Sequence, residues 1–259
     1  MNKFLKIALA AIIATGYSSV DTMASAEEDF NLFGFGERIE ASSKNATRNI
    51  TVDGSYDELK VTRGITVNFT AGKGKTTAKV SGPENLVELA SVKVEKGVLK
   101  VSFTKEFNLK GKNIVVDITG ALPSEYKGSA GATINVNSDV KKPGTLEVSG
   151  SAGADVNFNG KVSGGTIEVS ASAGAGVNFN GDVKVHSGEV KASAGGAVNI
   201  NSITAGDLEL KASAGGEVTA SGTAKRVNAK ASAGGEVNIK GLKSDSCNVK
   251  ASAGGEVKR

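Results

Sequence analysis

Two stretches in the second half of the chain are nearly identical: Thr145–Gly160 reads TLEVSGSAGADVNFNG and Thr166–Gly181 reads TIEVSASAGAGVNFNG. The Ser-Ala-Gly at their centre occurs seven times, at intervals of 22, 21, 21, 20, 19 and 20 residues, starting at Ser129, Ser151, Ser172, Ser193, Ser213, Ser232 and Ser252. A nearly constant period with matching neighbours is the sequence signature of a repeat architecture.

Each copy alternates apolar and polar residues on both sides of the Ser-Ala-Gly, as in Leu146-Glu147-Val148 before it and Val156-Asn157-Phe158 after it. Period two predicts strands, so one copy reads as strand, tight corner, strand and turn, with glycine available for positive φ. The apolar set of one copy is too small to form a core, so copies must stack. We therefore predict an all-β fold, a single-stranded, parallel β-helix-like β-solenoid with repeats of about 20 residues and rungs about 4.8 Å apart. A β-sandwich is the less favoured alternative, because it does not require a constant period.

The rest of the chain divides by composition. Residues 48–128 form a first β half of short alternating runs with irregular rungs, and residues 129–259 form the Ser-Ala-Gly solenoid. Residues 27–47 have no clear period and read as a leader or N-terminal cover. Residues 1–26 read as a signal peptide, with Lys3 and Lys6, a short apolar run, and Ala24-Ser25-Ala26 as the cleavage site. The apolar run is too short to span a membrane, so we expect no transmembrane segment in the mature chain and an exported protein in the periplasm, on the outer membrane surface or secreted.

Little in the composition points to chemistry. Cys247 is the only cysteine and His186 the only histidine, so no intramolecular disulfide and no zinc spacing is available. Without residues 1–26 the chain has 29 basic and 26 acidic side chains, a net charge of +3, which does not favour nucleic acid as a partner. We expect no catalytic residue, no metal site and no cofactor.

Two charge patterns follow the repeat. Lysines stand two residues before the serine of Ser-Ala-Gly and glutamates four residues after it; these candidate surface ladders are Lys191, Lys211, Lys230 and Lys250, and Glu217, Glu236 and Glu256. If rungs stack, like charges lie about 5 Å apart. One hypothesis is that the ladders bind a repetitive charged partner such as a surface polysaccharide. The alternative is that they keep the coil soluble and deter edge-to-edge aggregation.

The first half carries a family resemblance. Tyr56–Val61 (YDELKV), Gly64–Phe69 (GITVNF), Val98–Val101 (VLKV), Leu122-Pro123 and Gly128–Gly131 (GSAG) together resemble the head GIN domain family of auto-transporter adhesins from Bacteroidetes. The resemblance covers roughly residues 50–259. It implies a β-helix-like fold and an envelope or secreted location, and it brings no catalytic residues.

The expected function is that of an exported, non-catalytic envelope protein, an adhesin or a structural module that presents a surface. Its partners would be a surface polysaccharide or a host or matrix protein, with self-association through the C-terminal edge as a further expectation. The alternative is a polysaccharide-active enzyme on a β-helix scaffold. Asp139, Asp155, Asp182 and Asp207 do not stand at equivalent repeat positions, which favours the non-catalytic interpretation.

Overall fold

The computed structural model describes residues 37–259. The predicted signal peptide (1–26) and residues 27–36 of the predicted leader lie outside this range. The described residues divide into two units, one that contains residues 37–39 and 106–110 and one of residues 40–105 and 111–259. In the described part of the first unit, β1 (Arg38–Glu40) pairs with β8 (Asn108–Lys110), and the Asn108 N–H donates to the Glu37 carbonyl at 2.9 Å.

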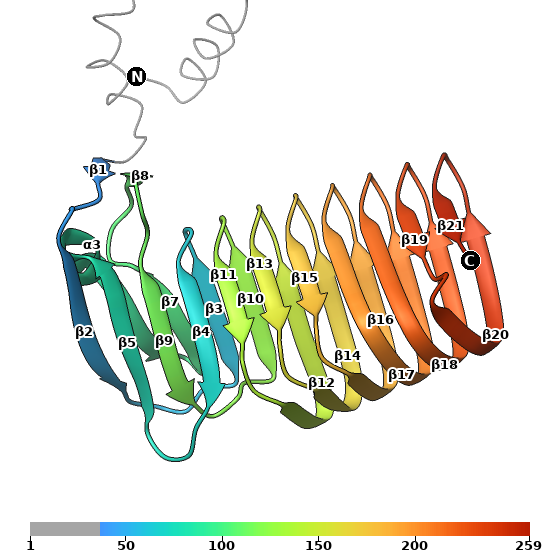
Figure 1. The fold of residues 1–259 in the computed structure, drawn as a ribbon, viewed down its shortest axis with the longest axis horizontal. Helices are drawn as coiled ribbons and strands as arrows, with labels where there is room; N and C mark the ends of the chain where they lie inside the picture. The colour runs from blue at the N-terminus through green and yellow to red at the C-terminus, as the bar shows by residue number, and fades with distance from the viewer. Residues whose placement is uncertain (1–36) are drawn as a thin grey trace, which may run out of the picture. The chain divides into compact units, whose positions relative to one another are not determined.

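The second unit is a β-solenoid whose parallel strands lie side by side along the coil (Figure 1). Each full rung of its second half has three sides, here called A, B and C. Side A contains β6 (Ala90–Glu95), β7 (Val98–Phe103), β3 (Glu58–Thr62), β10 (Glu125–Ser129) and the second halves of β12 (Val140–Gly150), β14 (Val162–Ala171), β16 (Val183–Ala192) and β20 (Leu242–Ala251). Side B contains β2 (Asn45–Val52), β5 (Thr76–Pro83), β9 (Val115–Gly120), β4 (Thr66–Ala71), β11 (Thr133–Val136), β13 (Asp155–Phe158), β15 (Gly176–Phe179), β19 (Glu236–Asn238) and β21 (Glu256–Lys258).

Two long strands, β17 (Ala197–Ala212) and β18 (Glu217–Ala231), bend through all three sides. Side C consists of the middle of these strands and the first residues of β12, β14, β16 and β20. The sequence predicted two strands for each copy, whereas a full rung has three strand segments. Side C is the segment that was not predicted. Its runs are only three residues long, as in Val162–Gly164, so they show no period-two pattern, although they pair in parallel with the next rung.

Neighbouring rungs pair residue for residue, as the repeat predicted. Glu147 lies opposite Glu168, and Glu168 lies opposite Glu189. The same register puts Val156 beside Val177 and Phe158 beside Phe179 on side B. These side chains are almost fully buried, at 1% exposure or less. The predicted parallel β-solenoid is therefore confirmed, and its core is a set of apolar columns that run along the coil axis.

The Ser-Ala-Gly corner is a tight turn with two left-handed residues. Ala152 has φ of 48° and Gly153 has φ of 71°, and the N–H of Ala154 donates to the Ser151 carbonyl at 3.2 Å. Positive φ at both central residues is the requirement of a type I′ turn. An alanine in this region costs roughly 1–2 kcal/mol, and only the glycine was expected there. The stacked corners hold it, since the Gly153 N–H also donates to the Ala173 carbonyl of the next rung at 3.0 Å.

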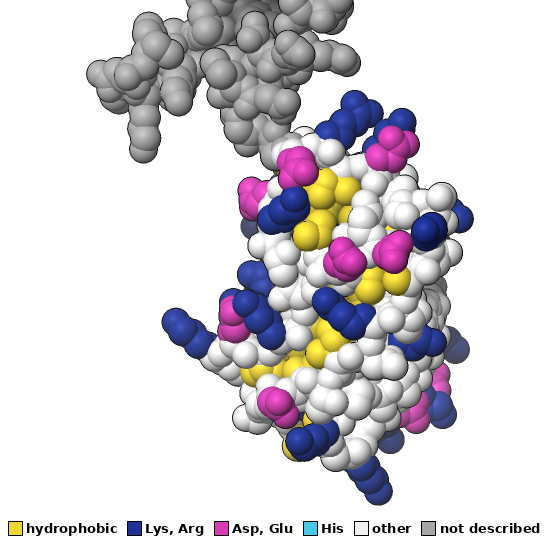
Figure 2. All heavy atoms as spheres, turned by 90° about the vertical axis from the view of Figure 1, so that its left-hand side faces the viewer, with side chains coloured by type: hydrophobic (Ala, Val, Ile, Leu, Met, Phe, Trp, Pro, Cys, Tyr) yellow, Lys and Arg dark blue, Asp and Glu magenta, His cyan; other side chains and the backbone are white. Residues whose placement is uncertain are grey.

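The first half of the chain begins the same coil. β3 and β4 pair in parallel with β10 and β11, whereas β5 is antiparallel to both β2 and β9. The short helix α3 (Glu84–Leu89) buries Leu86 and Val87 at this end. Figure 2 shows that hydrophobic side chains reach the surface of this end in a small patch and in a narrow diagonal band, both flanked by charged side chains. Among the described residues, no helix has the length and apolar character needed to cross a membrane.

Candidate binding face

The outward side chains of side A form two rows of opposite charge, which together are called the Glu/Lys face. The register aligns the first row as Glu58, Glu125, Glu147, Glu168, Glu189, Glu209, Asn228 and Asn248. It aligns the second row as Lys60, Lys127, Ser149, Ser170, Lys191, Lys211, Lys230 and Lys250. On each strand the two rows are two residues apart, so they share one face of the sheet.

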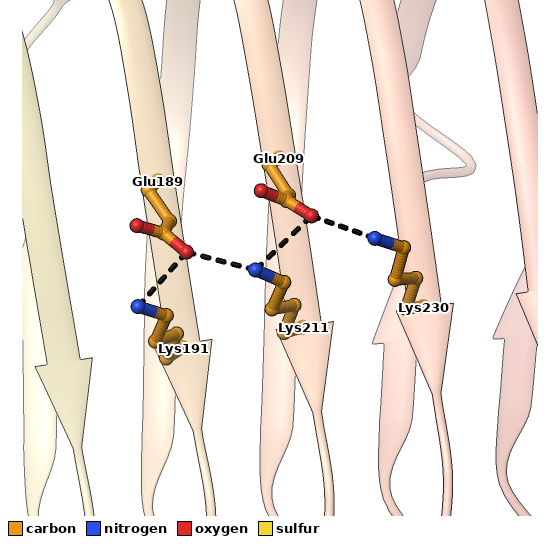
Figure 3. A network of polar contacts seen from close by, with 5 residues as sticks. All are labelled: Glu189, Lys191, Glu209, Lys211 and Lys230. Carbon is orange, nitrogen blue, oxygen red and sulfur yellow. Dashed lines mark hydrogen bonds and ion pairs between the residues drawn. The ribbon is translucent and has the colours of Figure 1, made fainter.

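The glutamates bridge the lysines along the coil axis (Figure 3). Glu189 Oε1 lies 2.8 Å from both Lys191 Nζ and Lys211 Nζ. Glu209 Oε1 lies 3.1 Å from Lys211 Nζ and 2.8 Å from Lys230 Nζ. The lysine ladder therefore stacks in register, but it is not a row of bare like charges, because carboxylates stand between its members.

Glu189 and Glu209 are not among the residues predicted from the sequence, although their position relative to the Ser-Ala-Gly repeats is constant. A glutamate stands four residues before the Ser-Ala-Gly serine at Glu147, Glu168, Glu189 and Glu209. Only the glutamates after the serine were considered, and the structure places these on another side. Glu217, Glu236 and Glu256 align on side B, where Lys258 Nζ lies 2.5 Å from Glu236 Oε2 and 3.9 Å from Glu256 Oε2.

The compensation of charge is uneven along the Glu/Lys face. Ser149 and Ser170 take the lysine positions beside Glu147 and Glu168, and among residues 37–259 these two carboxylates make no ion pair. Asn248 takes the glutamate position beside Lys250, which likewise has no carboxylate partner in the described chain. The face thus changes from acidic at β12 and β14 through neutral at β16 and β17 to basic at β20.

A neutral polar row occupies side B. The side-chain amide Nδ2 of Asn199 donates to Asn178 Oδ1 at 2.9 Å, and the same bond repeats rung by rung through Asn157, Asn135 and Asn68. The row ends at β9, where Asn68 Nδ2 donates to Asp117 Oδ1 at 2.8 Å. Each amide therefore ties two rungs together in addition to their backbone hydrogen bonds.

The two residues singled out for their chemistry lie apart. His186 is exposed where β16 bends from side C to side A, and Cys247 is half-buried in β20 with a free thiol. No group of three His, Cys, Asp or Glu side chains within residues 37–259 is arranged to hold a metal ion.

A family model covers most of the chain. The model of the family described as "Putative auto-transporter adhesin, head GIN domain" matches residues 55–187 and 167–258. The chain belongs to the head GIN domain family. The description of this family implies a surface or envelope location, as the resemblance suggested. No curated protein sequence matches the chain.

Solved structures show a similar fold. A "putative adhesin" from Parabacteroides merdae superposes with a TM-score of 0.65 at 19% identity, over 86% of this chain and 99% of that one. A "putative adhesin" from Parabacteroides distasonis gives 0.58 at 16% identity, over 83% and 100%. A "putative lipid binding protein" from the same species gives 0.58 at 16% identity, over 86% and 99%. At these identities the likeness supports the β-solenoid fold alone.

The network of the Glu/Lys face predicts a pH dependence of stability. Hydrogen bonds from Lys191 and Lys211 lower the pKa of Glu189, and those from Lys230 and Lys211 lower the pKa of Glu209. A carboxylate whose pKa is lowered by folding adds stability that is present above its unfolded pKa, about 4.3, and lost as pH falls through the lowered value. Both side chains are about one third exposed, at 33% and 32%, so we expect less than about 1 kcal/mol for each.

The variant Glu189→Gln/Glu209→Gln should therefore lose less stability than the unmodified chain when the pH falls below about 4.3. Chemical unfolding followed by circular dichroism at pH 7, 4 and 3 measures this difference. The matched control is Glu147→Gln/Glu168→Gln, which has no ion pair to lose. Equal pH profiles for the first variant and the unmodified chain would contradict the network.

Proposed function

We propose that the chain is an exported, non-catalytic adhesion module of the cell envelope that holds an extended partner along its Glu/Lys face. The observation that carries the proposal is the row from Lys191 to Lys230, whose charges are fixed in register on a regular sheet. Charges that are already ordered before binding lose little side-chain entropy when a partner docks. They also specify the partner and its register more than they add raw affinity.

The partner would carry charges of both signs. Because Glu189 and Glu209 pair with the three lysines from Lys191 to Lys230, this part of the face presents both signs of charge and keeps a net charge of only +1, which gives little attraction to a purely anionic chain. A surface polysaccharide with mixed charges, or a host or matrix protein, fits such a face. The location follows the same proposal: export to the periplasm, the outer membrane surface or the medium, with the mature chain beginning near Glu27.

Two neighbouring carboxylates on the Glu/Lys face bear on the enzymatic alternative. Glu147 and Glu168 lie in adjacent rungs, about 4.8 Å apart along the sheet, and retaining glycosidases place two carboxyl groups about 5–5.5 Å apart. Both glutamates are exposed on an open face, whereas a general acid needs an environment that raises its pKa. We therefore favour binding without turnover.

The proposal is tested on an array of glycans and matrix proteins probed with the mature chain. Replacing Lys191, Lys211, Lys230 and Lys250 by serine should lower the signal for the bound ligand at least tenfold, since the loss of a single charge-assisted contact of about 1.5–3 kcal/mol already reduces affinity by that factor. The matched control replaces four exposed lysines away from the face, Lys44, Lys73, Lys112 and Lys240, and should bind normally. Unchanged binding by the first variant would contradict the proposal, and shortening of a bound polysaccharide would favour the enzyme.

Self-association is a separate proposal. Among the described strands, β20 pairs only with β18 and β21 only with β19, so both have an unpaired edge. Such an edge can pair with a second copy.

A further inference from the structure

Side C carries a second charged surface that the Glu/Lys face does not include. Its outward positions align as Lys141, Ser163, Lys184, Thr204, Thr223 and Lys243. Lys141 and Lys184 are thus separated by two rungs, about 10 Å. Lys225 follows two rungs after Lys184, at the point where β18 bends toward side A.

A groove of about 670 Å³ runs between these lysines. Three of the residues that line the groove are small: Gly164, Ala205 and Gly206. Larger side chains at these positions would fill it. No larger residue fits at Gly164, because a Cβ there would lie 1.6 Å from the Lys142 carbonyl oxygen. The groove is therefore built into the rungs and does not depend on the rotamer of any one surface side chain.

The lysines of this groove, called the basic groove below, differ from those of the Glu/Lys face. Lys141, Lys184 and Lys225 are exposed, and within the described chain none of them makes an ion pair. None of the residues that line the groove is acidic. Asp245 stands opposite Lys225 in the next rung, just past the end of the groove, and is not bonded to it. Unpaired charges of one sign along a concave surface concentrate positive potential there.

The remaining lining matches a sugar chain. The Ser163 and Thr204 hydroxyls can donate to and accept from sugar hydroxyls, and the exposed Pro143 offers apolar surface to the C–H face of a ring. The His186 ring forms part of the wall. A single-stranded nucleic acid is bound instead by aromatic platforms on which bases stack, and no Phe, Tyr or Arg lines this groove.

We propose that the basic groove binds an acidic polysaccharide that runs parallel to the coil axis and places a carboxylate or sulfate group at every second rung. The in-register spacing of Lys141 and Lys184, two rungs or about 10 Å, fits a polymer that carries one anionic group on each disaccharide. This site lies on a different side of the coil from the Glu/Lys face, so it does not rest on the adhesion proposal.

The test uses fluorescently labelled hyaluronan decasaccharide, which has one carboxylate on each disaccharide, titrated with the mature chain. The variant Lys141→Gln/Lys184→Gln/Lys225→Gln should weaken binding by roughly tenfold or more and reduce its salt dependence. The matched control Lys44→Gln/Lys73→Gln/Lys240→Gln removes the same charge from exposed positions outside both the groove and the Glu/Lys face, and it should bind within about twofold of the unmodified chain. A neutral N-acetylglucosamine oligomer of the same length should not bind.

A second variant tests the shape of the groove independently of its positive charge. Ser163→Tyr keeps all three lysines and fills the groove, and it should weaken binding as much as the lysine variant does. Circular dichroism melting shows that each variant is folded. Equal losses in the groove variant and in its control, unchanged affinity in both groove variants, or tighter binding of a single-stranded oligonucleotide or of phosphatidylglycerol vesicles would overturn the proposal. Because adhesion through the Glu/Lys face is tested at Lys191, Lys211, Lys230 and Lys250, which both groove variants keep, the two proposals can fail separately.

Discussion

Replacing Phe158 by alanine is expected to lower the free energy of unfolding by about 3–5 kcal/mol, the cost of removing a large aromatic side chain from a packed core. Phe158 is 1% exposed and lies between two aromatic neighbours. Its ring stacks on Phe179 with centroids 4.9 Å apart, and it meets Tyr126 edge to face at 5.1 Å. The variant removes contacts with the next rung of side B and, across the core, with side A of the preceding rung. Neither neighbouring rung can move inward without losing its backbone register.

Guanidinium unfolding followed by circular dichroism measures this loss. Phe158→Leu keeps most of the volume and should cost less than about 1.5 kcal/mol. Tyr126→Phe is the second control: it keeps the edge-to-face contact and removes a buried hydroxyl that has no hydrogen-bond partner within the described residues, so stability should be equal or higher. A loss below about 1 kcal/mol for Phe158→Ala would contradict the packing of the column.

Replacing Gly196 by alanine is expected to cost about 1–3 kcal/mol or more, because the new methyl group overpacks the corner between two rungs. A Cβ at Gly196 would lie 2.5 Å from both the carbonyl carbon and the oxygen of Ala171. The control is Gly144→Ala, since no atom lies within 4 Å of the position where that Cβ would stand. It should change stability by less than about 0.5 kcal/mol.

The corners pair small residues between rungs in two ways. A Cβ at Gly128 or Gly150 would meet the side chain of Ala154 or Ala175, whereas a Cβ at Gly196, Gly216, Gly235 or Gly255 would meet the backbone of Ala171, Ala192, Ala212 or Ala231. Because Ala171→Gly leaves that backbone in place, the double variant Ala171→Gly/Gly196→Ala should not recover the stability lost by Gly196→Ala in a double-mutant cycle. Recovery of most of the lost stability would contradict the backbone contact.

The repeat predicted most of the fold because a stacked coil translates sequence period directly into register. Ser151 and Ser172 are one copy apart in the chain and one rung apart in space. Side C escaped prediction because three residues are too few to show a period. The left-handed Ala152 escaped because local preference disfavours it, and only the stacked turns of neighbouring rungs hold it there. Helix α3 is six residues long and interrupts a run of strands, so it had no periodic signal either.

The surface was less predictable than the fold. The alignment of Lys191 with Lys211 followed from the period, but its electrostatic meaning depended on Glu189, whose place beside both lysines is set by the three-dimensional sheet. The basic groove depends on Lys141 and Lys184, which lie in the side C segments of β12 and β16. These segments have no sequence motif comparable to the Ser-Ala-Gly. These lysines become neighbours only when the coil stacks the side C segments of successive rungs.

The asparagine row of side B gives the coil an electrical direction. All its amide N–H groups point the same way, from Asn199 toward Asn68, so their dipoles add and the positive end of the sum meets the Asp117 carboxylate. A helix acquires polarity from its backbone in the same manner, whereas a β-sheet has only a small net dipole. Here side chains supply the polarity, and Asp117 is the counter-charge that terminates it, much as an acidic residue caps the start of a helix.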